Sequence, residues 1–187
     1  MTRNLILVAT AAVLLAGCGT MPTPMSTSQA FMATAMSHKS TKKVTLDRAS
    51  FNYGQQVARA KYGKPMLTAA PQPTKIDQYS YDFGRVVGYL EGAEDCYNNL
   101  SGSFNSDQWK NFADQQYDAL VAAEKLIQQD RQLEANCGVA LGIIQGGISS
   151  YNNLSGSFDS QQWKNFADTN YQNVAQAINA LLRAEGQ

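Results

Sequence analysis

Two aspartates, Asp114 and Asp168, close two copies of one 18-residue sequence and are the carboxylates best placed for chemistry. The copies span residues 97–114 and 151–168 and are identical at sixteen of eighteen positions. A two-fold relation between the copies could bring the two carboxylates together for acid–base catalysis, as in a cell-wall hydrolase. Each aspartate also follows a lysine by four residues, which is typical of an ion pair on a solvated helix face. The solvated face is the simpler interpretation, and we expect no catalytic residues.

The rest of the chain offers few groups for catalysis or for metal binding. His38, the single histidine, lies outside the repeats. There is no Cys/His cluster for a metal and no Ser/His/Asp set for nucleophilic attack. We therefore expect no metal and no small-molecule cofactor. The 15 basic residues balance 15 acidic ones, which argues against nucleic acid as a partner because nucleic-acid binding needs a basic surface.

The N-terminus has the parts of an export signal. Arg3 precedes an apolar run from Leu5 to Leu15, and small residues follow that run. The run is too short to cross a membrane, which takes about 20 apolar residues. It ends in Leu-Ala-Gly-Cys18, which resembles the lipobox of bacterial lipoproteins. An ordinary secretory signal that leaves Cys18 as a free thiol is the alternative.

The lipobox resemblance implies a location. In bacterial lipoproteins the signal is cut before the cysteine, which then carries fatty acyl chains such as palmitate. Transferred here, Cys18 becomes the acylated first residue of the mature chain, and more than one acyl chain makes a stable anchor. Gly19 follows it, where an aspartate would resemble a signal for retention in the inner membrane. We expect an outer-membrane protein that faces the periplasm.

The remaining sequence predicts one all-α domain behind a flexible tether. Within that domain, two tandem helical hairpins should form a pseudo-two-fold bundle preceded by an extra helix. The expected segments are a signal peptide at 1–17, a tether at 18–45, and a helical domain at 46–187. That domain divides into an extra helix at 46–63, a proline-containing linker at 64–75, and hairpin repeats at 76–130 and 131–187.

The first helix of each hairpin, expected at about 76–97 and 134–151, carries a glycine every four residues. These glycines are Gly84, Gly88 and Gly92 in the first copy and Gly138, Gly142 and Gly146 in the second. Glycine inside a helix costs about 1 kcal/mol relative to alanine, so close approach of another helix is expected to offset it. We expect the two glycine helices to face each other at the centre of the bundle.

Charged residues bear on this expectation. A membrane-spanning glycine zipper is the alternative to a soluble bundle, and Arg85, Glu91, Glu94 and Asp95 in the first copy argue against it. The three acidic residues have no charged counterparts in the second copy. We interpret them as a solvated charge run.

The second helix of each hairpin begins inside the repeated sequence. Asn105 and Asp159 are predicted N-caps, with a glutamine three residues later in the capping-box position. A phenylalanine before each cap and a tryptophan four residues after it predict a hydrophobic staple. The Trp and Phe side chains are therefore interpreted as core residues rather than as a ligand platform.

Cys96 and Cys137 are the cysteines other than Cys18. In an exported protein such a pair is expected to form a disulfide, which requires Cα atoms within about 7 Å. If the glycine helices were parallel and in register, the two cysteines would lie about 20 Å apart at 1.5 Å per residue. The disulfide thus predicts antiparallel glycine helices.

The loops between the paired helices are the candidate partner-binding surface, because loops on a rigid scaffold commonly hold binding residues. The alternative is that the two loop sequences are alike because asparagine and glycine are favoured in turns, which accounts for part of the sequence identity between them. The candidate residues are Tyr97, Asn98, Asn99, Leu100 and Ser101, with Tyr151, Asn152, Asn153, Leu154 and Ser155.

The second glycine helix supplies one further resemblance. The segment from Cys137 to Gly146, with its spacing to Trp163, is similar to helical periplasmic immunity proteins that neutralise type VI secretion amidases. That resemblance implies inhibitor binding. We expect a non-catalytic protein that binds another envelope protein as an accessory or assembly factor of an envelope or secretion machine. The alternatives are an immunity or exclusion lipoprotein that blocks an effector, plasmid or phage, and the hydrolase above.

Overall fold

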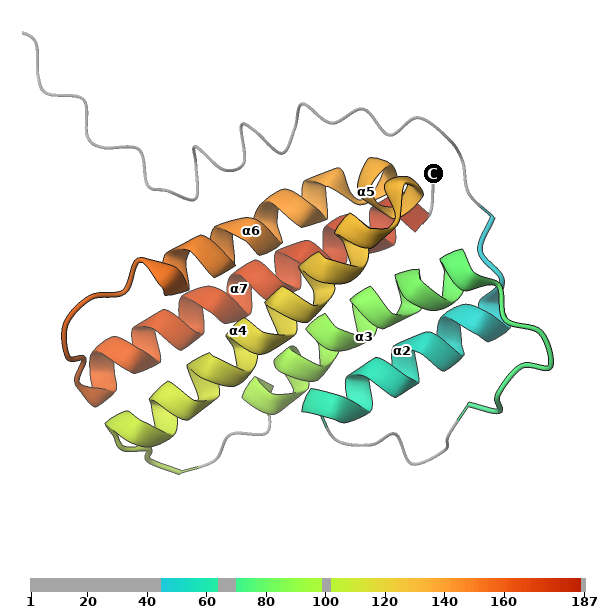
Figure 1. The fold of residues 1–187 in the computed structure, drawn as a ribbon. Coiled ribbons are helices and arrows are strands. Elements are labelled where there is room, and N and C mark those ends of the chain that lie inside the picture. The colour runs from blue at the N-terminus through green and yellow to red at the C-terminus, as the bar shows by residue number, and fades with distance from the viewer. Residues whose placement is uncertain (1–44, 64–69, 99–101, 186–187) are drawn as a thin grey trace, which may run out of the picture.

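The computed structural model describes residues 45–63, 70–98 and 102–185, and helices joined by loops make up this part of the chain, with no strand among the described residues (Figure 1). The predicted all-α fold class is confirmed. The predicted signal peptide and nearly all of the tether, Cys18 included, lie outside the described residues. The helices are α2 (Arg48–Tyr62), α3 (Gln78–Asn98), α4 (Ser106–Gln129), α5 (Arg131–Asn136), α6 (Gly138–Asn152) and α7 (Ser160–Glu185).

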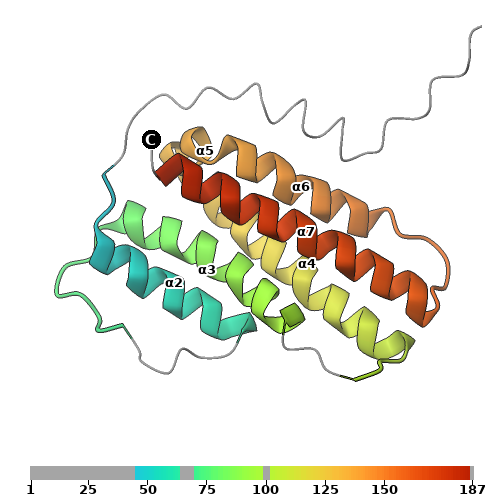
Figure 2. The same cartoon turned by 180° about the vertical axis from the view of Figure 1, so that it is seen from behind.

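Four long helices form a bundle from two hairpins, α3–α4 and α6–α7. α3 and α6 run in one direction and α4 and α7 in the other, so both repeated loops lie at one end of the molecule (Figures 1 and 2). α4 and α7 pack along each other, and each also packs against both α3 and α6. This arrangement fits the predicted pseudo-two-fold, with its axis along the bundle.

The second helix of each hairpin begins as the sequence predicts. The Asn105 side chain accepts a hydrogen bond from the Gln108 backbone N–H (2.9 Å), and the Gln108 side chain accepts one from the Asn105 N–H (3.0 Å). Asp159 and Gln162 form the same reciprocal pair. The staple is also present, because the rings of Phe104 and Trp109 lie 5.3 Å apart and their counterparts in the second repeat lie 5.1 Å apart. The capping box and the staple are confirmed.

α2 docks in parallel on the glycine face of α3, in the closest helix contact of the molecule. A Cβ placed on Gly84 would lie 2.1 Å from the carbonyl oxygen of Phe51, and one on Gly88 would lie 2.2 Å from that of Gln55. In the other direction, a Cβ on Gly54 would lie 2.1 Å from the Tyr81 carbonyl oxygen. The two backbones therefore approach as closely as glycine alone permits.

The starts of α2 and α3 are tied together by two exchanged hydrogen bonds. The backbone N–H of Asp47 donates to the Ser80 hydroxyl (2.8 Å), and that of Asp77 donates to the Ser50 hydroxyl (2.9 Å). Each aspartate also caps the helix of its own serine. Ser50 to Gly54 and Ser80 to Gly84 are similar in sequence, and they hold equivalent places in this helix pair.

The expectation that the two glycine helices face each other is wrong. α3 and α6 lie diagonally across the bundle and do not pack along each other, and α2 and α6 are at opposite edges (Figures 1 and 2). The physical reason is that α2 fills the glycine face of α3. The helix expected at 134–151 is also interrupted, because Asp130 caps a separate short helix, α5, and α6 begins only after Cys137.

Among the described residues, the buried polar side chains are Ser50 and Ser80, whose hydroxyls accept backbone hydrogen bonds, and one pair of amides. The core contains leucine, isoleucine and valine side chains from all four long helices, including Leu90, Leu120 and Ile144. Gln116 on α4 and Asn170 on α7 hold equivalent repeat positions and are each 1% exposed. Their side-chain nitrogens and oxygens have no hydrogen-bond partner among the described residues. Two buried amides thus lie at equivalent depth in the two central helices.

Candidate functional site

The loop end of the bundle is held by contacts that cross between the repeats. The Tyr97 hydroxyl, at the end of α3, donates to Asp168 on α7. In the same way Tyr151, at the end of α6, donates to Asp114 on α4. The repeats therefore exchange the same tyrosine–aspartate contact in both directions.

Aromatic and cationic side chains complete this crossing. Tyr97 stacks on Tyr171 with ring centroids 4.5 Å apart, and Tyr117 and Tyr151 are 4.4 Å apart. The two repeat lysines extend over tryptophans of the opposite copy. Lys164 Nζ lies 5.8 Å from the Trp109 ring centroid, and the reverse contact of Lys110 with Trp163 measures 5.9 Å. We call these contacts the crossover cluster: Tyr97, Trp109, Lys110, Asp114, Tyr117 and their counterparts Tyr151, Trp163, Lys164, Asp168 and Tyr171.

The crossover cluster fixes the protonation of its members. Burial, together with the hydrogen bond to Asp168, raises the pKa of Tyr97 to about 12. Burial also raises the pKa of Tyr151. Burial by itself would raise the pKa of Asp168, but the hydrogen bonds from Lys164 and Tyr97 outweigh it and lower that pKa. At neutral pH Asp168 is therefore ionised, and Tyr97 and Tyr151 are neutral hydroxyls that can donate to the carboxylates.

The carboxylates of the repeats each have a local cation. Lys110 Nζ lies 2.8 Å from Asp114, and Lys164 Nζ lies 2.6 Å from Asp168. Among the described residues, no three His, Cys, Asp or Glu side chains gather closely enough to hold a metal ion. In the same part of the chain, no helix is both long and apolar enough to cross a membrane.

The candidate loop residues divide into three groups. Tyr97 and Tyr151 are partly buried in the crossover cluster, and that use accounts for their presence in both copies. Asn98, Asn152, Asn153 and Ser155 are exposed, and Leu154 is partly buried. Asn99, Leu100 and Ser101 lie outside the described residues. Partner binding by these loops stays a prediction.

The predicted disulfide is contradicted, because Cys96 and Cys137 are free thiols. The two hairpins stand parallel and in register, so Cys96 at the end of α3 and Cys137 at the start of α6 lie at opposite ends of the bundle (Figure 1). The Cys96 thiol donates to the Tyr62 carbonyl oxygen. Burial raises the pKa of Cys137 to about 12, and burial also raises that of Cys96. Both thiols are therefore protonated at neutral pH.

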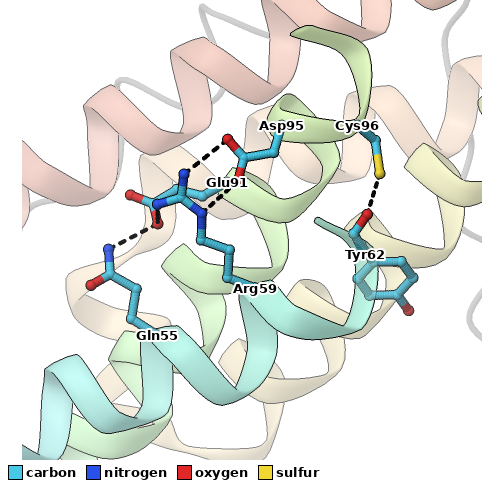
Figure 3. A network of polar contacts seen from close by, with 6 residues as sticks. All are labelled: Gln55, Arg59, Tyr62, Glu91, Asp95 and Cys96. Atoms are coloured by element: carbon cyan, nitrogen blue, oxygen red, sulfur yellow. Dashed lines mark hydrogen bonds and ion pairs between the residues drawn. The ribbon is translucent and has the colours of Figure 1, made fainter. Parts of the chain in front are cut away.

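The interpretation of Glu91 and Asp95 as part of a solvated charge run is also wrong. Figure 3 shows Arg59 of α2 reaching both carboxylates on α3. Its Nε and Nη2 lie 2.5 and 2.8 Å from the two oxygens of Asp95, and its Nη1 lies 3.3 Å from Glu91. The Gln55 side chain donates to Glu91 as well (2.9 Å). Burial raises the pKa of Glu91, and Arg59 and Gln55 partly offset that rise.

A groove at the junction of α2, α3 and α4 is a concave surface that the sequence did not predict. Its volume is about 470 Å³. Lys61 Nζ lies 5.0 Å from the ring centroid of Tyr62 and 5.7 Å from that of Tyr89. The lining residues are Lys61, Tyr62, Arg85, Tyr89, Asp118, Val121, Ala122, Lys125, Leu126 and Gln129. We call this the basic groove, because it has three cations and one carboxylate.

The basic groove belongs to the first repeat alone. Fifty-four residues further on, Arg85 is replaced by Val139, Tyr89 by Ile143, and Lys125 by Asn179. The α2 residues of the groove have no counterpart in the second hairpin. In the sequence, the groove is indicated only by the difference in charge between the two repeats at these positions. That difference does not predict that α2, α3 and α4 meet there.

Comparison with protein-family models, with curated proteins and with solved structures gives no significant match to this chain.

Proposed function

We propose that the chain is a lipid-anchored outer-membrane protein that faces the periplasm and binds another envelope protein without catalysis, as an accessory or assembly factor. The anchor is the acylated Cys18, inferred from the lipobox. The observation that carries the binding role is the basic groove, which combines cations with tyrosine rings on a rigid helical scaffold. Such a combination favours an acidic segment of a partner, because cations and aromatic rings are the anchors enriched at protein interfaces.

The placement of the surfaces supports this role. The described chain begins next to α2, at the end of the bundle opposite the repeated loops (Figure 1). A tether from residue 18 to α2 would leave the loop end pointing away from the membrane and the basic groove on the side of the bundle. Both surfaces then remain open to a periplasmic partner.

A photo-crosslinking experiment in cells tests the proposal. A photoreactive residue replaces Val121 in the basic groove or, as a matched control, Ala175 at the equivalent place in the second repeat. Both positions are partly buried on a helix. A third probe at Leu154 reports on the loops. One dominant protein adduct from Val121, lost when Lys61 and Lys125 are both changed to glutamate, would support binding in the groove.

Other outcomes of this experiment are equally informative. An adduct from Leu154 alone would assign binding to the loops and would contradict the groove. No adduct from any probe, with the protein folded and in the outer membrane, would contradict the binding role. The identity of the adduct separates an assembly factor from an immunity protein, since the latter would capture an incoming effector. Labelling with a palmitate analogue, lost in Cys18→Ser, tests the anchor independently.

A further inference from the structure

The outer side of α6 repeats the glycine spacing that α2 covers on α3. We call it the α6 glycine face. It lies opposite Ala140, Ile144 and Gly147, which are buried on the inner side of the helix. The face consists of Val139, Gly142, Gln145, Gly146 and Ser149. Gly138, one turn before Gly142, is buried and does not belong to the open face.

The α6 glycine face is more open than its counterpart on α3. Gly88 and Gly92 are buried under α2, whereas the equivalent Gly142 and Gly146 are partly exposed. At the edge of the face, Val139 is 38% exposed. Within the described chain α6 packs on α4, on α7 and, at its start, on α5, and no helix covers its outer side (Figures 1 and 2).

The energetics of glycine make this openness informative. Each glycine in a helix interior costs about 1 kcal/mol relative to alanine. On α3 the cost is offset by the close approach of α2, where even a single Cβ would meet a backbone carbonyl. On α6 a single chain provides no such offset at Gly142 and Gly146.

We propose that the α6 glycine face is the contact surface of a parallel two-fold dimer of this chain. Charge favours a second copy as the occupant, because α6 has no charged residue between Gly138 and Asn152. Two identical α6 faces meet without like-charge repulsion between α6 residues, as a two-fold contact requires. The Glu124 carboxylate of α4, beside the face, accepts a hydrogen bond from Gln145 (3.0 Å). The equivalent face of α3 carries Glu91 and Asp95 and needs Arg59 of α2 to balance them.

The pair formed by α2 and α3 shows how such a contact is built. These helices share the Ser-x-x-x-Gly pattern of Ser50 to Gly54 and Ser80 to Gly84, run parallel, and exchange equivalent contacts. α6 is the next helix of the same repeat type, and its counterpart in a second copy is the matching partner. A parallel two-fold also keeps the two starting residues, Thr45 of each copy, at the same end of the dimer.

A single helix pair makes a small interface, so the dimer is a weak one by the usual size classes. Leu182, at the end of α7, is 46% exposed. The end of α7 lies at the same end of the bundle as the start of α6 (Figure 1). Confinement of two copies to one surface would raise their effective concentration and favour the dimer further.

Cysteine crosslinking of the full chain in intact cells tests the dimer. Ser149→Cys places a thiol on the α6 glycine face, and Thr169→Cys places one on an exposed position of α7 as the matched control. A short membrane-permeant bismaleimide is added, and the native chain controls for Cys96 and Cys137. We expect at least about fivefold more product of twice the chain mass from Ser149→Cys than from Thr169→Cys. Mass spectrometry should find this chain alone in that product.

A second variant ties the product to the face. Adding Gly142→Leu to Ser149→Cys should abolish the crosslink while circular dichroism and the melting temperature show an intact fold, and Gly146→Leu serves if the first variant is unstable. A product that contains a different protein would overturn the second copy as the occupant. Equal crosslinking from both cysteine positions, or a crosslink that survives Gly142→Leu, would overturn the contact surface. A Ser149→Cys thiol that forms no dimer and is protected from monofunctional maleimide would assign the face to another occupant.

Discussion

α3 and α6 are the first helices of two copies of one hairpin, yet only α3 has a helix docked on its glycines. The residues around those glycines differ accordingly. Where α2 is present, Glu91 and Asp95 of α3 meet Arg59. Where it is absent, α6 has Gln145 and Ser149 at the same positions. The charges on the first helix of a repeat therefore depend on the helix that packs against it, and not on the repeat itself.

The loop end shows the opposite relation. There the copies are nearly identical because each reaches into the other, with Tyr97 on Asp168 and Tyr151 on Asp114. A change in one copy would disturb a contact of the second copy as well. Symmetric contact accounts for similarity at this end, and an asymmetric neighbour accounts for divergence along the first helices.

The largest expected difference in stability is between two separate variants, each of which adds one methyl group to a glycine face. Gly88→Ala would place a Cβ about 2.2 Å from the Gln55 carbonyl oxygen, so α2 must shift as a whole. We expect the free energy of unfolding to fall by about 2–4 kcal/mol. Gly142→Ala gains the same helix propensity with no helix against it, and we expect a rise of up to about 1 kcal/mol. Urea unfolding measures both.

These two variants are each other's control, because the substitution and the repeat position are the same. Equal effects in the two helices would contradict the asymmetry. A large loss in Gly142→Ala would indicate a close neighbour on α6 within the same chain.

An intermediate loss of stability is expected when Arg59 is replaced. This residue of α2 supplies the positive charge that pairs with two carboxylates on α3. Arg59→Gln removes the Arg59 cation from two partly buried carboxylates, and we expect a loss of about 2 kcal/mol at pH 7. Burial holds the pKa of Glu91 above its ordinary value, so the ionised form destabilises the fold as the pH rises through the folded-state pKa. Without Arg59 that pKa rises further, and the loss should therefore be larger at pH 7 than at pH 4.

Arg48→Gln is the control for this variant. Arg48 pairs with Glu185, but its side chain is 68% exposed, so its removal should cost less than about 0.5 kcal/mol at either pH. A loss in Arg59→Gln that is the same at pH 4 and pH 7 would show that packing of the side chain, and not its charge, holds α2.

Local patterns in the sequence predicted local structure well. The capping boxes at Asn105 and Asp159 depend on residues three apart, and they form as predicted. The glycine spacing predicted close helix packing correctly on α3, where α2 docks, but within the described chain no helix covers the matching glycines of α6. It did not identify the partner, because α2 and α6 are both plausible neighbours for α3 until the register of the bundle is known.

The errors about the cysteines and the acidic residues have one cause. The disulfide expected between Cys96 and Cys137 requires antiparallel glycine helices. The crossover cluster instead requires parallel hairpins in register, because Tyr97 and Tyr151 must both reach the second helix of the other copy. No pattern within one repeat reveals a contact that exists only between repeats. In the same way, the sequence of the first repeat alone does not reveal that Arg59 of α2 pairs with Glu91.

The smallest expected effect tests the symmetric end of the comparison. Tyr97→Phe removes one hydroxyl that donates to a carboxylate, and we expect a loss of about 1 kcal/mol at pH 8. Because the pKa of Tyr97 is about 12 in the folded chain against an ordinary 10.0, the neutral form stabilises the fold below pH 10, and this contribution is lost as the pH rises toward 12. The difference between Tyr97→Phe and the native chain should therefore shrink over that range. Tyr151→Phe should show a loss of similar size by urea unfolding, since its contact is the same one reversed. A loss confined to one of the two variants would show that the crossover cluster is symmetric in shape but not in energy.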